Sequence, residues 1–141
     1  MLHDETRLRL PVRPNDLDAL GHVNNAVVLE YLEAGRWAWL AAHGIDPDHR
    51  VIAVVARAEI DYRAEIPRGE IELRTRLDAP GPAELEDADL VYRARFDQRL
   101  YLPGSTEPAA EAKITVAFLD AELRCLVTLH DFLASAKEPV R

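Results

Sequence analysis

The sequence lacks the features that cross-link a chain covalently or attach it to a membrane. Cys125 is the single cysteine among 141 residues, so no disulfide can form within the chain. No apolar run approaches the ~20 residues that span a bilayer, and the first ten residues lack the apolar segment of a signal peptide. We therefore expect a cytoplasmic protein that does not associate with a membrane.

Positive charge is also scarce. The chain carries 17 basic and 25 acidic residues, and its formal net charge is −8. This balance disfavours nonspecific binding to nucleic acid or to anionic lipid. Hydrophobic residues make up 48% of the chain, which excludes a disordered protein. The length, and the absence of repeats and linkers, predict one domain over residues 1–141.

Familiar catalytic and cofactor-binding motifs are missing too. The sequence has no Gly-x-Ser-x-Gly elbow, no glycine-rich phosphate loop, no dinucleotide fingerprint and no Cys/His spacing typical of zinc. Asp16, Asp18 and His22 are close together but lack further ligands for a metal. We predict no metal and no cofactor. Cys125 has no basic neighbour in the sequence, which indicates an unreactive thiol.

The most informative stretch is residues 15–36, NDLDALGHVNNAVVLEYLEAGR. Its first half is polar, and Gly21 permits a backbone turn there. Its second half starts the one long helical pattern, predicted over residues 25–43 because Asn24 or Asn25 can cap it and glycine follows it. The residues predicted to form its buried stripe are Val28, Leu32, Gly35 and Trp39.

Five segments alternate between apolar and polar residues with a period of two, which predicts half-buried strands. The first covers residues 6–13 and the other four follow the helix. The residues predicted to share one face are Ile52, Val54, Ala56, Ala58, Ile60 and Tyr62; Ile71, Leu73, Thr75 and Leu77; Leu90, Tyr92, Ala94 and Phe96; and Ala110, Ala112, Ile114, Val116 and Phe118.

This alternation favours an antiparallel sheet with one covered face. We therefore predict an α+β fold in which five strands curve around the long helix, with a short amphipathic helix near residues 129–136. One helix covers five strands poorly. We expect a homodimer or homotetramer that buries edges or faces of the sheet.

A carboxylate lies just before the predicted helix start. A helix N-terminus presents free N–H groups and a partial positive charge, which suit a polarised carbonyl oxygen. Asp18, six residues before Asn24, could attack that carbonyl or activate water. The more common role of such an aspartate is a cap or a turn. His22 is a weaker candidate for a base.

The stretch from Asp16 to Asn25, with Leu32-Glu33 and Arg36 in the helix, resembles the signature of the 4-hydroxybenzoyl-CoA thioesterase family of hotdog-fold proteins. Residues 55–62 with 66–70 are similar to that family's second strand and its turn, and residues 111–117 to its last strand. The resemblance covers about residues 5–120.

The resemblance implies a helix wrapped by five or six antiparallel strands, assembled as dimers or tetramers with active sites at the dimer interface. It implies hydrolysis of acyl-CoA or aroyl-CoA thioesters without a metal or cofactor. Asp18 would be the catalytic carboxylate, and backbone N–H groups at Asn25 and Asn24 would bind the carbonyl. Gly21 and His22 would support the loop.

Other positions are secondary candidates. Val28 stands where relatives usually carry an aromatic residue, so it bears on the acyl pocket. Glu33 lies near enough to line a pocket across a dimer seam, or it pairs on the helix surface with Arg36. The candidates for binding CoA phosphates are Arg57, Arg63 and Arg68, although a solvated strand face explains them better.

Two other functions stay open. A non-catalytic hotdog domain would bind acyl groups or CoA without turnover. A hotdog dehydratase or hydratase would move protons at carbon with a histidine and a carboxylate, and His22 with Asp18 fits that poorly. The sequence also does not decide whether Asp18 attacks the thioester or activates water.

Overall fold

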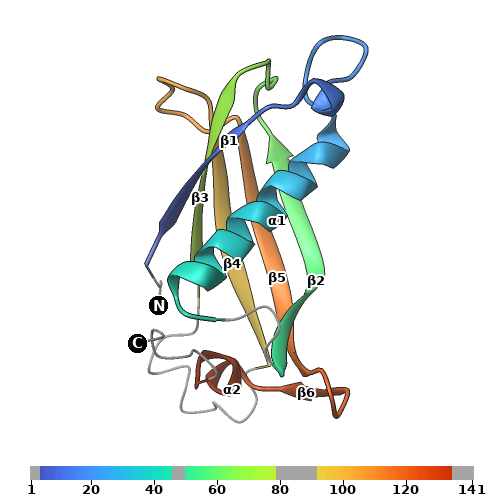
Figure 1. Cartoon of the computed structure of the whole chain (residues 1–141), viewed down its shortest axis with the longest axis vertical. Coiled ribbons are helices and arrows are strands. Elements are labelled where there is room, and N and C mark those ends of the chain that lie inside the picture. The colour runs from blue at the N-terminus through green and yellow to red at the C-terminus, as the bar shows by residue number, and fades with distance from the viewer. Residues whose placement is uncertain (1–3, 46–49, 79–91, 135–141) are drawn as a thin grey trace.

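The structure is a computed structural model that describes residues 4–45, 50–78 and 92–134. Its elements, in chain order, are β1 (Thr6–Pro11), the short 3-10 helix η1 (Pro14–Asp16), α1 (Asn25–Ala42), β2 (Val51–Tyr62), β3 (Glu70–Asp78), β4 (Arg93–Tyr101), β5 (Ala110–Asp120), β6 (Cys125–Val127) and α2 (Leu129–Ala134) (Figure 1). Leu90 and residues 135–136, which the sequence predictions include, lie outside the described residues.

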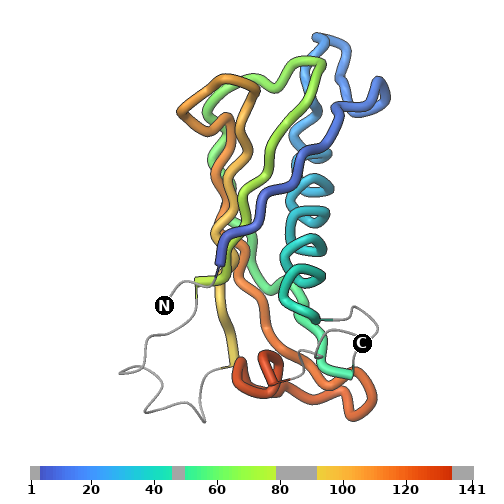
Figure 2. The backbone as a smooth tube through the Cα atoms, turned by 60° about the vertical axis from the view of Figure 1, so that its left-hand side comes forward, coloured from blue at the N-terminus to red at the C-terminus, as the bar shows by residue number. Residues whose placement is uncertain are grey.

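The strands form one antiparallel sheet in the order β1-β3-β4-β5-β2, and the short β6 pairs with β5. The long helix α1 lies across one face of this sheet, which curves around it (Figures 1 and 2). This arrangement confirms the predicted α+β fold. The strand β6 was not predicted, because three residues are too few to show a periodic pattern.

Helix α1 buries the stripe that its spacing predicts. Val28, Leu32, Gly35 and Trp39 are all buried, together with Tyr31. The helix begins at the Asn24 cap, whose side chain accepts the Ala26 N–H at 2.9 Å. It ends at Ala42, and Gly44 then adopts a left-handed conformation with φ +71°.

Glycine at position 35 allows α1 to approach the sheet closely. A Cβ there would lie 2.8 Å from Thr75 Oγ1 and 2.9 Å from Gln98 Nε2. Both polar side chains are fully buried and hydrogen-bonded to each other at 3.0 Å. The helix therefore packs directly on a buried polar pair, which only a residue without a side chain permits.

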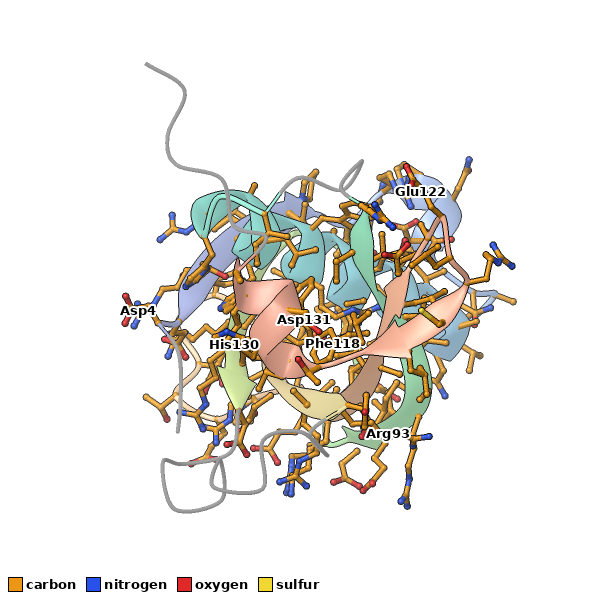
Figure 3. All side chains as sticks on the ribbon, turned by 90° about the horizontal axis from the view of Figure 1, so that it is seen from below. Asp4, Arg93, Phe118, Glu122, His130 and Asp131 are labelled. Atoms are coloured by element: carbon orange, nitrogen blue, oxygen red, sulfur yellow. The ribbon has the colours of Figure 1, made fainter. Side chains whose placement is uncertain are left out.

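Most of the predicted strand faces are confirmed. The predicted residues of β3 and β5 are all buried. In β4 the buried face comprises Ala94 and Phe96 and continues through Gln98 and Leu100, whereas Tyr92 precedes the strand and is exposed. At the end of the molecule seen in Figure 3, α2 covers the core, and Phe132 stacks on Phe118 with ring centroids 4.7 Å apart.

The face predicted for the first half of β2 is wrong. The pairing of β2 with β5 shifts between Val55 and Arg57, so Ala56 forms a β-bulge. The extra residue reverses the faces before it, and Val51 and Ala53, rather than Ile52 and Val54, pack against the core. A pattern of period two cannot reveal a bulge when residues on both sides are apolar.

Candidate active site

The loop between η1 and α1 holds Asp18 at its tip. Leu17 and Val23 form an antiparallel bridge, and the Asp18 N–H donates to the His22 carbonyl at 2.7 Å. Gly21 turns the chain with φ +82°. This short ladder returns the chain to the start of α1. Asp18 therefore lies opposite His22, and His22 is two residues before the helix cap Asn24.

The Asp18 side chain is exposed and partly used by the loop itself. Its Oδ1 accepts the N–H groups of Leu20 at 2.9 Å and His22 at 3.2 Å. Its Oδ2 has no hydrogen-bond partner in the part of the chain that the structure describes. One oxygen therefore stabilises the turn, and the other is available to a ligand.

Asp16, two residues earlier, is a structural carboxylate. It is 2% exposed and accepts hydrogen bonds from the Arg13 N–H at 2.9 Å, from the Arg13 guanidinium at 2.9 Å and from the Tyr31 hydroxyl at 2.6 Å. Burial alone would raise the pKa of Asp16, but the Arg13 and Tyr31 hydrogen bonds outweigh it, and the pKa lies below its usual value.

The start of α1 offers one free backbone donor. The Asn24 N–H is already used, because it donates to the Asp16 carbonyl at 2.9 Å. The expectation that Asn24 supplies a carbonyl-binding N–H is therefore wrong. The Asn25 N–H has no acceptor among the described residues, as is usual at the first residue of a helix.

The remaining loop and helix candidates have structural contacts. His22 Nε2 lies 3.1 Å from Glu65 Oε2, which ties the loop to the chain that follows β2. Val28 is 1% exposed and packs in the hydrophobic core of the single chain. Its expected place at the acyl pocket is therefore not seen, because its side chain faces the sheet beneath α1.

A cavity of about 360 Å³ lies between the second half of α1 and the first half of β2. Glu33, a predicted candidate, is exposed at this cavity, and its Oε1 accepts the Trp37 indole N–H at 3.2 Å. The cavity is also lined by Arg36, Leu40, Ala53, Val55, Phe96 and Phe132.

The cavity and Asp18 lie at opposite ends of β2. The Tyr62 hydroxyl donates to the Asn25 carbonyl at 3.0 Å, so the helix start lies at the last residue of β2. The cavity is lined by residues 51–53 and Val55. These residues belong to the start of β2, which lies at the end of the strand away from the start of α1 (Figure 1). Val55, the lining residue of β2 nearest to Tyr62, is seven residues before it, about 23 Å at ~3.3 Å per residue. Along α1, Glu33 is eight residues after Asn25, about 12 Å at ~1.5 Å per residue. In one chain the cavity therefore does not adjoin the helix start.

The three candidate CoA arginines do not form a cluster of free charges. Arg57 pairs with Glu59 at 3.1 Å, and Arg63 pairs with Glu111 at 2.6 Å. Arg68 is exposed and has no ion pair among the described residues. The pairing of the first two supports the interpretation of a solvated, charged strand face.

Sequence reasoning missed Arg36 as a cavity residue. The surface ion pair expected between Glu33 and Arg36 is not formed; instead, the Arg36 guanidinium donates to Gln98 Oε1 at 3.1 Å. A polar residue on the otherwise apolar face of a strand, here Gln98 between Phe96 and Leu100 in β4, is the sequence signal that could have indicated a buried partner.

Neither a metal site nor a membrane helix is found in the described ranges. No three His, Cys, Asp or Glu side chains among those residues group closely enough to hold a metal ion. No helix there is both long and apolar enough to cross a membrane.

Comparison with known proteins identifies a family. The chain matches the sequence family described as the thioesterase-like superfamily over residues 12–137. No curated protein matches it. A Thermus thermophilus thioesterase, described as complexed with coenzyme A and Zn, superimposes with a TM-score of 0.72 at 29% identity, covering 92% of this chain and 94% of that one.

Two further solved structures share the fold at lower identity. A 1,4-dihydroxy-2-naphthoyl-CoA thioesterase from Synechocystis gives a TM-score of 0.76 at 15% identity, covering 94% of this chain and 95% of that one. A DHNA-CoA thioesterase from Staphylococcus aureus gives 0.74 at 11% identity, covering 91% and 83%. The family match spans nearly the whole chain, and the fold agrees with it. The chain therefore belongs to the thioesterase-like superfamily of hotdog-fold proteins.

Proposed function

We propose that this protein hydrolyses acyl-CoA thioesters to the free acid and CoA, with Asp18 as the catalytic carboxylate. Family membership supports the reaction class. The assignment is carried by two groups at the two ends of one short loop: a carboxylate oxygen of the exposed Asp18 with no partner among the described residues, and the unused N–H of Asn25 at the positive end of α1. Acyl transfer without a metal requires these two groups, a nucleophile or base and a donor that binds the carbonyl oxygen.

The chemistry has two forms that use the same groups. The Asn25 N–H donates a hydrogen bond to the thioester oxygen and stabilises the negative charge that develops on it. In one form Asp18 Oδ2 attacks the carbonyl carbon, the C–S bond breaks to release CoA thiolate, and water hydrolyses the mixed anhydride. In the other, Asp18 removes a proton from water as the water attacks, and the proton passes to the departing sulfur.

We further propose that the active site is completed in a homodimer through β2. This strand is an edge of the sheet and exposes Val54, Val55 and Tyr62 at 37%, 52% and 45%, which makes it available for pairing. Two copies paired antiparallel about a two-fold axis place the end of one β2 beside the start of the other. Asp18 of one copy then lies beside the cavity of the second.

The direct test is CoA release from a panel of acyl-CoAs, followed with a thiol-reactive dye. Asp18→Asn keeps the size of the side chain and an oxygen for the turn, so we expect it to fold and to lose about 100-fold or more in kcat/KM. Asp4→Asn, at an exposed aspartate near the other end of α1, is the matched control. Equal rates for the wild type and Asp18→Asn would refute the role of Asp18.

A non-catalytic binding domain is the second candidate. The two N–H groups bound by Asp18 Oδ1 favour it, because they show that this carboxylate also has a structural role in the loop. Binding of CoA or acyl-CoA without release of thiol from any thioester would establish this alternative.

A further inference from the structure

The described lining of the cavity beside α1 has one half-buried cation among mostly apolar side chains. Arg36 lines it and is half-buried, with Leu40, Phe96 and Phe132 among its neighbours in the lining. A volume of about 360 Å³ is within the range of small-molecule pockets, which combine apolar walls with a few polar groups.

Arg36 is held in place by a neutral group. Its Nη1 donates to Gln98 Oε1 at 3.1 Å, and Gln98 is fully buried. The amide of Gln98 cannot turn around without losing contacts, because its Nε2 donates to the Leu32 carbonyl at 2.8 Å and to the Thr75 hydroxyl at 3.0 Å. The guanidinium is therefore oriented by the core without being neutralised.

The charge of Arg36 has no close counter-charge. No carboxylate lies within ion-pair distance of it in the described part of the chain, and Gln98 is its one hydrogen-bond partner there. Burial lowers the pKa of Arg36, and the charge of Glu33 opposes this from a greater distance. Glu33 itself is exposed and hydrogen-bonded to Trp37.

We propose that Arg36 binds a carboxylate at the far end of the substrate's acyl group, so that the preferred substrates are thioesters of dicarboxylic acids. This rests on the proposed function, in which the acyl group enters this cavity. A guanidinium has five N–H donors arranged to bind a carboxylate with two parallel hydrogen bonds. An uncharged acyl chain of the same length would leave the remaining donors unpaired.

The experiment measures binding separately from turnover. Two non-hydrolysable thioether analogues of CoA are titrated calorimetrically, one with a six-carbon chain ending in a methyl group and one of equal length ending in a carboxylate. The proteins are the wild type, Arg36→Gln, Arg36→Lys and the control Arg93→Gln, at an exposed arginine of β4.

We expect the wild type and the control to bind the carboxylated analogue at least tenfold more tightly. Arg36→Gln should bind both analogues within about twofold of each other, and Arg36→Lys should retain part of the preference. Equal binding of both analogues by the wild type would overturn the proposal. An equal loss of affinity for both analogues in Arg36→Gln would also overturn it, because that result indicates a structural role. Dissociation of a dimer in Arg36→Gln with the preference unchanged would overturn it too, because that result indicates an ion pair between copies.

Turnover separates this proposal from the function on which it rests. Faster hydrolysis of hexanoyl-CoA than of adipoyl-CoA by the wild type would refute the role of Arg36 and leave the thioesterase assignment intact. No hydrolysis of either thioester, with a preference for the carboxylated analogue, would refute the hydrolase and keep the binding role of Arg36.

Discussion

At the scale of single residues, burial separates two aspartates that the sequence places two positions apart. Asp16 is enclosed by Arg13 and Tyr31, and all of its hydrogen bonds are structural. Asp18 is exposed, and only one of its oxygens is used. A catalytic carboxylate needs a free oxygen and exposure to solvent, so Asp18, rather than Asp16, is the one that we propose as catalytic.

Asp16 should make the protein sensitive to acid. Its pKa in the folded state lies below the usual value of 3.8 because of Arg13 and Tyr31, so its contribution to stability is present above that value and is lost as the pH falls through the folded pKa. Asp16→Asn should destabilise the protein at neutral pH by about 1–3 kcal/mol and flatten the loss of stability at low pH. Denaturant unfolding between pH 2 and 7 measures both effects. An unchanged pH profile would contradict this assignment.

At the scale of elements, the contact between α1 and the sheet depends on one missing side chain. Gly35 sits over Thr75 and Gln98, whose amide also orients Arg36. A stable helix would ordinarily prefer alanine to glycine. The glycine is therefore explained by packing, and the packing connects the core to the cavity.

Gly35→Ala should be destabilising although alanine favours a helix by about 1 kcal/mol. The added methyl group would lie 2.8 Å from the Thr75 hydroxyl oxygen, and we expect a net cost of about 1–3 kcal/mol from the forced separation of helix and sheet. The midpoint of denaturant unfolding measures it. Ala41→Gly, at an exposed position of α1, measures the effect of helix propensity on stability without a change in packing. A more stable Gly35→Ala variant would refute the close contact.

At the scale of the whole molecule, charge and exposure favour one edge for assembly. The outer face of the sheet carries a series of ion pairs, including Arg76 with Asp97 at 3.0 Å and Arg63 with Glu111 at 2.6 Å. Such a face is unsuited to a dry contact with another copy. The long edge strand β2 is more apolar and more exposed, which is why we assign assembly to it.

Val54→Lys should separate the proposed dimer and abolish thioester hydrolysis. Val54 lies on β2 but does not line the cavity, so a loss of activity would follow from the loss of assembly rather than from a changed pocket. Lysine on an edge strand is a common obstacle to strand pairing. Light scattering and kcat/KM measure the two effects. Leu126→Lys, at an exposed position of β6, should change neither. A dimeric, active Val54→Lys variant would contradict pairing through β2.

Local patterns predicted much of the fold. Apolar residues repeat every 3.6 residues in a helix and every two residues in a strand when one face is buried. The stripe of α1 and the faces of β3 and β5 could therefore be derived from the sequence. The bulge at Ala56 could not, because one extra residue in a strand with apolar neighbours leaves the composition unchanged. The candidate site was likewise predicted in part, through its loop and helix start.

The sequence by itself determined the long helix, the five main strands, the aspartate-bearing loop and the family, since each depends on residues that are neighbours along the chain. Only the tertiary structure decided which aspartate is enclosed, that the Asn24 N–H is occupied while that of Asn25 is free, and that Arg36 turns from Glu33 to Gln98. These are contacts between residues far apart in the chain or between competing local partners. Their outcome depends on the packing of α1 against the sheet.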